Sequence, residues 1–236
     1  MSQKNSAGWL PGIGGGIIGA ALTAGALLLA APSLLGERLV RDTLVSNPEI
    51  IVDAGQALRD RQYAETLQPI RASLERPFFS SWKGAEKPDV TMTYFFDYAC
   101  PYCRQSNSDI ERLIKEEKGL RVVYRELPIL GPGSVAAARV SLAASKAGTF
   151  AQYYDSLYAA GRPSPDTIAI AAKAAGVPAQ PSADPAQEAE LRSNMSLASQ
   201  LGATGTPLFV VGDRVMNAAV GYDTLKSAIE AARKKG

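Results

Sequence analysis

The two cysteines of the chain stand three positions apart, at Cys100 and Cys103, with Pro101 and Tyr102 between them. Thiols one helical turn apart can close a disulfide and open it again by exchange with another thiol. At the N-terminus of a helix, unpaired N–H groups and the positive end of the helix dipole stabilise a thiolate. We therefore predict a redox dithiol in which Cys100 is the nucleophile and Cys103 closes the disulfide.

The flanking sequence places this dithiol between a strand and a helix. An apolar and aromatic run over Val90–Phe96 predicts a buried strand. After the cysteines, Ile110 and Leu113 share one helical face, and Gly119 is a stop signal. Pro101 suits the first helical turn, where its missing N–H costs nothing. These elements predict a dithiol at the start of a helix that follows a strand.

Two alternative roles for the cysteine pair are weaker. A structural disulfide across so short a loop would constrain the unfolded chain little. Half of a structural zinc site would need further ligands, because zinc takes four, and the chain has no third cysteine and no histidine. The spacing thus favours redox chemistry, with no metal and no separate cofactor.

Residues 1–36 form a hydrophobic leader. Lys4 is the only charged residue in it, and the apolar run exceeds the roughly 7–15 residues of a signal-peptide core and the roughly 18 needed to span a bilayer. Its length favours a retained membrane anchor, whereas its glycines and the small residues at 24–26 favour a cleaved secretory signal. In either case the rest of the chain is exported, to a compartment where disulfides persist.

Residues 37–76 predict a helical N-terminal extension. Leu44, Ile51 and Leu58 recur at seven-residue intervals, the spacing of a seam between chains. The alternative is an amphipathic helix that lies on its own domain or acts as a spacer, and Pro69 interrupts the pattern. Homo-oligomerisation through this extension is therefore one of two hypotheses.

The remainder of the chain predicts further strands around a long helical stretch. Strands are expected over Leu120–Glu126 and Leu208–Val211 and again at Val215, with a helical insertion at about 133–203 and a last helix from Asp223. Twenty-five basic and 23 acidic residues give a net charge of +2 without a basic stripe. This balance does not indicate a nucleic-acid partner.

In this order, the strand, the Cys-Pro-Tyr-Cys helix, the inserted helices and the Gly-Thr-Pro-Leu-Phe-Val segment at 205–210 resemble the thioredoxin fold of the DsbA family. The resemblance covers roughly Phe78–Gly236. The leader and Asn47-Pro48-Glu49 resemble the branch that includes ScsC. The implied α/β architecture is a thioredoxin fold over residues 77–236 that contains an inserted all-helical domain. The extension at 37–76 and the leader at 1–36 precede it.

The resemblance also implies a function. It is that of a periplasmic thiol–disulfide oxidoreductase that acts on unfolded or misoxidised exported proteins and is reset by a membrane or periplasmic redox partner. It implies that the Thr206–Pro207 bond is cis and that this loop contacts both the cysteines and an extended substrate segment. Whether the protein works as an oxidase or as an isomerase stays open.

The chain departs from the family pattern at two places. The DsbA dipeptide contains histidine where this chain has Tyr102, and a buried carboxylate of the family is replaced by Tyr94. The available acids are Asp97, three residues before Cys100, and Glu126 on the neighbouring strand. Each is either a proton relay to Cys103 or a strand-end or surface carboxylate without that role.

A function of a different class is Cu(I) binding by the same two thiols, in a copper-tolerance role. Soft thiolates suit Cu(I). Against this alternative, the chain has no histidine to assist, and a cis-proline at Pro207 would crowd a metal bound to the sulfurs.

Overall fold

The computed structural model of the chain describes residues 36–234, so that almost the whole predicted leader lies outside the described residues. The chain divides into two compact units, with the boundary between Ala57 and Leu58. In the first unit, residues 36–46 are helical, and helix α2 (Glu49–Leu67) begins after a short break. No helix within 36–234 is both long and apolar enough to cross a bilayer.

The second unit contains a mixed five-stranded sheet whose strand order is β1-β3-β2-β4-β5. The strands are β1 (Trp82–Gly84), β2 (Val90–Phe96), β3 (Leu120–Glu126), β4 (Leu208–Val211) and β5 (Arg214–Met216). Only the β2–β3 pair is parallel. The strands predicted around the cysteine motif and before the last helix are confirmed.

Strand register brings three chain segments to one edge of the sheet. Phe96 at the end of β2 pairs with Glu126 at the end of β3, because the two strands run in parallel and in step. The antiparallel β4 begins beside them, with Leu208 opposite Phe95. Three segments therefore meet here, namely those just after β2, just after β3 and just before β4. They include Asp97, Cys100 and Pro207.

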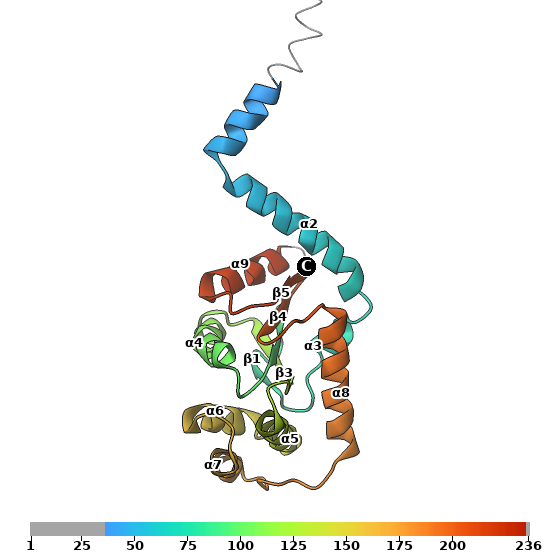
Figure 1. Cartoon of the computed structure of the whole chain (residues 1–236), viewed down its shortest axis with the longest axis vertical. Coiled ribbons are helices and arrows are strands. Elements are labelled where there is room, and N and C mark those ends of the chain that lie inside the picture. The colour runs from blue at the N-terminus through green and yellow to red at the C-terminus, as the bar shows by residue number, and fades with distance from the viewer. Residues whose placement is uncertain (1–35, 235–236) are drawn as a thin grey trace, which may run out of the picture. The chain divides into compact units, whose positions relative to one another are not determined.

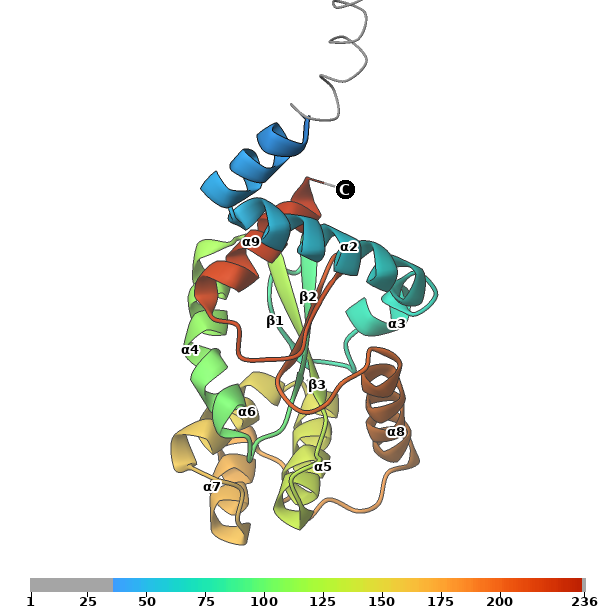
Figure 2. The same cartoon turned by 45° about the horizontal axis from the view of Figure 1, so that its top comes forward.

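Helices cover both faces of the sheet (Figures 1 and 2). The helices of this unit that follow α2 are α3 (Arg71–Glu75), α4 (Pro101–Glu116), α5 (Pro132–Lys146), α6 (Phe150–Ala160), α7 (Pro165–Ala175), α8 (Pro185–Gln200) and α9 (Tyr222–Arg233). Helices α4 and α9 pack on one face, and α3 and α8 pack on the other. Helices α5 to α8 form the expected insertion between β3 and β4.

The larger hydrophobic core lies on the α4 face of the sheet and is rich in aromatic rings. Tyr94 stacks on Phe209 with ring centroids 4.8 Å apart, and Tyr124 contacts Tyr154 of α6 edge-on at the same separation. Because aromatic pairs in these geometries add to the stabilisation from burial, this cluster joins the insertion firmly to the sheet. The tyrosines of α6 are therefore core residues.

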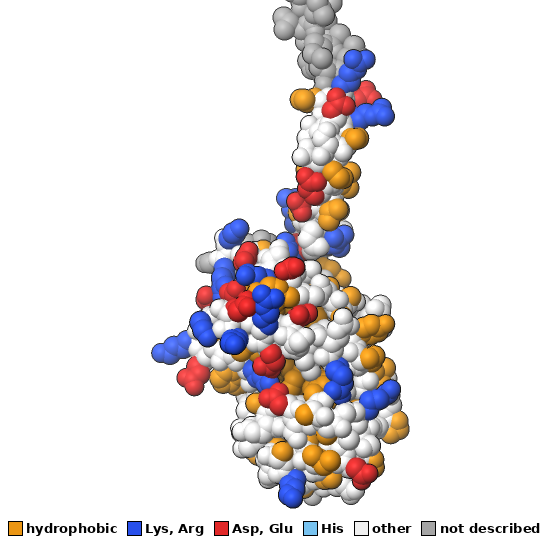
Figure 3. Space-filling view, turned by 90° about the vertical axis from the view of Figure 1, so that its left-hand side faces the viewer, with side chains coloured by type: hydrophobic (Ala, Val, Ile, Leu, Met, Phe, Trp, Pro, Cys, Tyr) orange, Lys and Arg blue, Asp and Glu red, His pale blue; other side chains and the backbone are white. Residues whose placement is uncertain are grey.

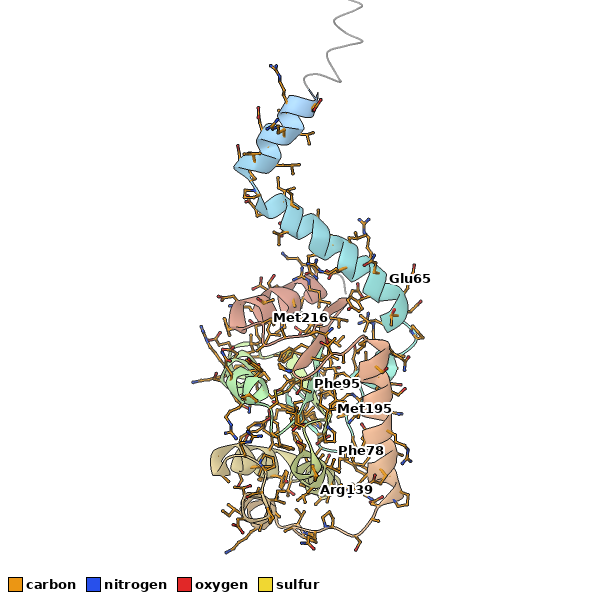
Figure 4. All side chains as sticks on the ribbon, viewed as in Figure 1. Glu65, Phe78, Phe95, Arg139, Met195 and Met216 are labelled. Atoms are coloured by element: carbon orange, nitrogen blue, oxygen red, sulfur yellow. The ribbon has the colours of Figure 1, made fainter. Side chains whose placement is uncertain are left out.

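The smaller core lies on the opposite face of the sheet. Successive residues of β2 point alternately to the two faces, so β2 contributes side chains to both cores. Phe95 points to this face (Figure 4) and packs with Leu67 at the end of α2, Leu74 of α3 and Leu197 of α8. The second half of the predicted extension thus belongs to the compact unit that holds the sheet. Full burial of Leu67 stabilises that arrangement by roughly 1.5–3 kcal/mol.

The basic end of the last helix is paired with acidic residues. Arg233 of α9 bonds Asp89 at 3.1 Å and Glu117 at 2.5 Å, and Arg112 bonds Glu116 on α4 at 2.9 Å. Figure 3 shows acidic and basic side chains interspersed over this part of the surface. Arg233, at the end of α9, is therefore paired with acidic residues of neighbouring segments.

Candidate active site

Cys100 is the N-cap residue of α4, and Pro101 occupies the first helical turn. The Cys100 N–H donates to the carbonyl of Asp97 at 3.0 Å, which closes the turn between β2 and the helix. Both cysteines are free thiols, and Cys103 is fully buried. The predicted placement of the pair at the start of a helix is confirmed.

The loop before β4 reaches the same place. The Thr206–Pro207 bond is cis, as expected, and Pro207 is buried. The Cys100 thiol donates to the Thr206 carbonyl, with 3.2 Å between sulfur and oxygen. The cysteine turn and the loop before β4, about a hundred residues apart in the sequence, are therefore in direct contact at the Cys100 sulfur. Tyr102, 61% exposed, lies at the surface next to Cys103 in the sequence.

The environment of Cys103 keeps it protonated at neutral pH. Burial raises the pKa of the Cys103 thiol to about 12, because an isolated charge is costly inside the protein. The Asp97 N–H and the hydroxyls of Tyr94 and Thr206 lie against this sulfur and oppose the shift, but desolvation outweighs them. Cys103 is thus a poor nucleophile until it is relieved of its proton.

Asp97 is buried, not at the surface. It follows the last residue of β2, and its carboxylate is 2% exposed. One oxygen accepts the Ala99 N–H at 2.8 Å, and the other accepts the N–H groups of Ile129 and Leu130 at 2.9 and 3.0 Å. Asp97 therefore stands at the end of a strand and is not a surface carboxylate, because the loop after β3 folds over it.

Glu126, the last residue of β3, is also buried rather than exposed. The Ser141 hydroxyl of α5 donates to its carboxylate at 2.6 Å, and Tyr98 hydrogen-bonds Ser141 at 2.8 Å. Burial raises the pKa of Glu126 to about 7, against the lowering effects of the Ser141 hydrogen bond and the Arg125 charge. Tyr98 lies between Asp97 and Cys100 in the chain, so that this network adjoins the cysteine loop without touching the sulfurs.

Three residues of the site carried no functional prediction from sequence. The Tyr94 hydroxyl donates to the Cys103 carbonyl at 3.3 Å, and the Tyr158 hydroxyl donates to the Asp97 carbonyl at 3.4 Å. The Arg104 guanidinium donates to the carbonyls of Tyr158 and Gly161 and stands over the Tyr158 ring at 5.1 Å. Only Tyr94 had a sequence signal, its position six residues before Cys100.

A reactive dithiol at a helix N-terminus, facing a cis-proline loop across a mixed sheet with inserted helices, defines a thiol–disulfide oxidoreductase of the thioredoxin fold. Comparison of the sequence with known protein families identifies the family within this class of oxidoreductases. Residues 91–230 match the DSBA-like thioredoxin domain, and the chain belongs to that family. Residues 37–65 match a second family, described as the N-terminal domain of the copper resistance protein ScsC.

Solved structures agree with this assignment. A periplasmic thioredoxin-like protein from Salmonella enterica serovar Typhimurium is 29% identical, with 71% of this chain and 97% of that chain covered and a TM-score of 0.65. ScsC from Proteus mirabilis in a transitional conformation is 28% identical, with coverages of 88% and 99% and a TM-score of 0.66. The chain also matches the Na(+)/H(+) antiporter NhaA 3 of Salinispora tropica, with 32% identity over 79 residues, but it spans only 12% of that relative's length.

Alkylation of the reduced protein with iodoacetamide at neutral pH is expected to modify Cys100 and to spare Cys103. Cys103 is fully buried and holds its proton, whereas Cys100 lies at the helix N-terminus. Peptide mass mapping identifies the modified residue, and alkylation in denaturant, where both thiols should react, is the control. Preferential modification of Cys103 would show that the roles are reversed.

The raised pKa of Glu126 predicts a pH-dependent stability. The folded pKa of about 7 exceeds the unfolded value of about 4.3, so the protonated carboxyl contributes stability below the unfolded value. This contribution, up to about 4 kcal/mol, is lost as pH rises through 7.

Denaturant unfolding across this range tests the effect. Glu126→Gln should flatten the fall in unfolding free energy between about pH 5 and 8. The matched control is Glu65→Gln, an exposed carboxylate on α2 (Figure 4), which should leave the wild-type slope in place. An unchanged slope in the Glu126 variant would exclude this residue as the titrating group.

Proposed function

We propose that this protein is a periplasmic enzyme that exchanges disulfides with exported proteins through Cys100 and Cys103. The observation that carries the proposal is the contact of the Cys100 thiol, at the start of α4, with the Thr206 carbonyl next to cis-Pro207. A substrate strand laid along that loop would meet the reactive sulfur. Similarity to a periplasmic thioredoxin-like protein supports the location, and membership of the DSBA-like family supports exported proteins as substrates and a separate redox partner.

The exchange proceeds through a mixed disulfide. In the oxidising direction, a substrate thiolate attacks the Cys100 sulfur and the Cys100–Cys103 bond breaks, with Cys103 leaving and taking up a proton. A second substrate thiolate then attacks the substrate sulfur, so that a substrate disulfide forms and Cys100 is released. Two electrons pass from the substrate to the dithiol.

In the opposite direction, the Cys100 thiolate attacks a wrong substrate disulfide and displaces one of its sulfurs. Cys103 then releases the enzyme by attacking Cys100, after losing its proton. Because burial raises the pKa of Cys103 to about 12, few molecules carry a Cys103 thiolate at neutral pH, and this release step is slow. An isomerase would use that delay to let substrate thiols rearrange first, and an oxidase would not need the step.

The chemistry is testable with two cysteine variants. Cys103→Ser should accumulate a mixed disulfide with an unfolded substrate, because the resolving thiol is gone, whereas Cys100→Ser should form none. Non-reducing electrophoresis detects the adduct, and the wild-type protein, assayed for oxidative refolding and for insulin reduction, gives the direction of catalysis. Exchange activity that survives in Cys100→Ser would refute the assignment.

We infer that the extension at 37–76, through its first part at 37–65, joins copies of the chain. It exposes several large apolar side chains, which are Leu39, Val40, Val45, Ile50, Ile51, Val52 and Leu58. Apolar side chains in this number are seldom left in water unless a partner covers them. The match of this segment to the ScsC N-terminal domain family, outside the residues that match the DSBA-like domain, supports a role for it apart from the redox chemistry.

Light scattering on the purified protein without its leader tests the association. The wild type is expected to be an oligomer, and Ile51→Glu with Leu58→Glu should reduce it to single chains by placing charges seven residues apart in the seam. Ile170→Glu, at a similarly exposed position on α7, is the control and should not change the mass. A wild-type mass of one chain would end this hypothesis.

Cu(I) binding is the second candidate function, because the family matched by residues 37–65 is described by copper resistance. Two thiols one turn apart suit Cu(I). Within residues 36–234, however, no group of three potential ligand residues surrounds them. Equilibrium dialysis of the reduced protein against Cu(I), run beside the exchange assay, separates a carrier from an enzyme.

A further inference from the structure

The main chain of Asp97 contacts both cysteines. Its backbone N–H lies against the Cys103 sulfur. Its carbonyl accepts the Cys100 N–H at 3.0 Å and the Tyr158 hydroxyl at 3.4 Å. All of its main-chain polar groups are therefore engaged with the active-site turn, and the carboxylate is left for another task.

The Asp97 carboxylate joins the cysteine turn to the loop at 127–131. One oxygen accepts the N–H of Ala99, within the turn, and the other accepts the N–H groups of Ile129 and Leu130. Because both oxygens belong to one buried carboxylate, the two loops are held side by side. Three N–H donors also compensate for the burial of its charge.

The loop that Asp97 holds is hydrogen-bonded through its backbone and exposes apolar side chains. Leu127 is buried, and its N–H donates to the Phe96 carbonyl at 2.7 Å. The next two large side chains, Ile129 and Leu130, are 41% and 51% exposed. These two neighbouring side chains belong to a loop that the Asp97 carboxylate joins to the Cys100 turn, where an apolar ligand could contact them.

We propose that Asp97 is a positioning residue that holds Ile129 and Leu130 beside Cys100 as a contact surface for an apolar segment of an unfolded polypeptide. This inference rests on the proposed function. The occupant follows from the chemistry, since a polypeptide bound to Cys100 in a mixed disulfide must lie over the adjoining surface. A small disulfide such as glutathione disulfide would not extend so far.

The geometry separates this role from that of a proton relay. Both carboxylate oxygens already accept backbone N–H groups, and the contact of Asp97 with Cys103 is made by the main chain. A relay would need a free oxygen directed at the thiol. Replacement of the carboxylate should therefore change substrate affinity and leave the pH profile of thiol exchange in place.

The test compares two substrates, reduced unfolded lysozyme and glutathione disulfide. Ile129→Ser with Leu130→Ser should raise the KM for the polypeptide about tenfold, with a much smaller change in kcat and in exchange with glutathione. Asp97→Asn should raise the same KM, because an amide has one acceptor oxygen and turns its NH₂ toward N–H donors, so that one loop is released.

Matched controls come from α8. Asp184→Asn alters another aspartate that caps backbone, since its side chain accepts the Ala186 N–H at 2.9 Å, and Met195→Ser (Figure 4) alters another exposed apolar side chain. Neither should change the KM. The double variant changes only exposed residues, so the test holds even if Asp97→Asn folds poorly.

The outcomes distinguish the two levels of the proposal. A wild-type protein that exchanges with neither substrate would overturn the proposed function itself. A wild type that exchanges with both, with an unchanged polypeptide KM in the double variant, would overturn the contact surface alone. A shifted pH profile in Asp97→Asn with unchanged KM would show a relay in place of a positioning residue.

Discussion

The parallel pairing of β2 with β3 is the constraint on which the site depends. The two strands end in step, at Phe96 and Glu126, and β4 starts beside them. A shift of one residue would turn Phe95 and Phe96 to the opposite faces and exchange the contents of the two cores. It would also move Asp97 away from the loop after β3. Register thus sets the packing of both cores and the geometry of the thiols together.

Two buried carboxylates stand at this edge and meet the cost of burial differently. Asp97 accepts three backbone N–H groups, which compensate a negative charge. Glu126 receives one hydroxyl, from Ser141, and burial raises its pKa to about 7. The same edge therefore contains one carboxylate that organises loops and one that can change its charge near neutral pH.

The two thiols also differ because of the elements around them. Cys100 caps a helix and touches a loop that a substrate can approach, whereas Cys103 lies one turn inside, against Tyr94 and the main chain of Asp97. Burial then gives Cys103 a pKa of about 12. Both thiols are buried, but Cys100, 4% exposed, lies at the helix N-terminus and Cys103 lies deeper and keeps its proton, so we expect exchange through the first and closure through the second.

Local sequence alone determined the elements and the reactive pair. Cys100 and Cys103 between an apolar strand and a helical pattern predicted a dithiol at the start of a helix, because strand and helix periodicities are properties of neighbouring residues. The thioredoxin-like order and the cis bond in Gly-Thr-Pro before β4 came from the resemblance to the DsbA family. The tertiary structure decided what surrounds the thiols. That Asp97 would be covered by residues 129–130, that Arg104 would reach the end of α6, and that Leu67 would enter the smaller core all depend on contacts between distant segments. Burial and hydrogen-bond partners arise only when such segments pack, and they, rather than residue type, set the pKa of Cys103 and the role of Asp97.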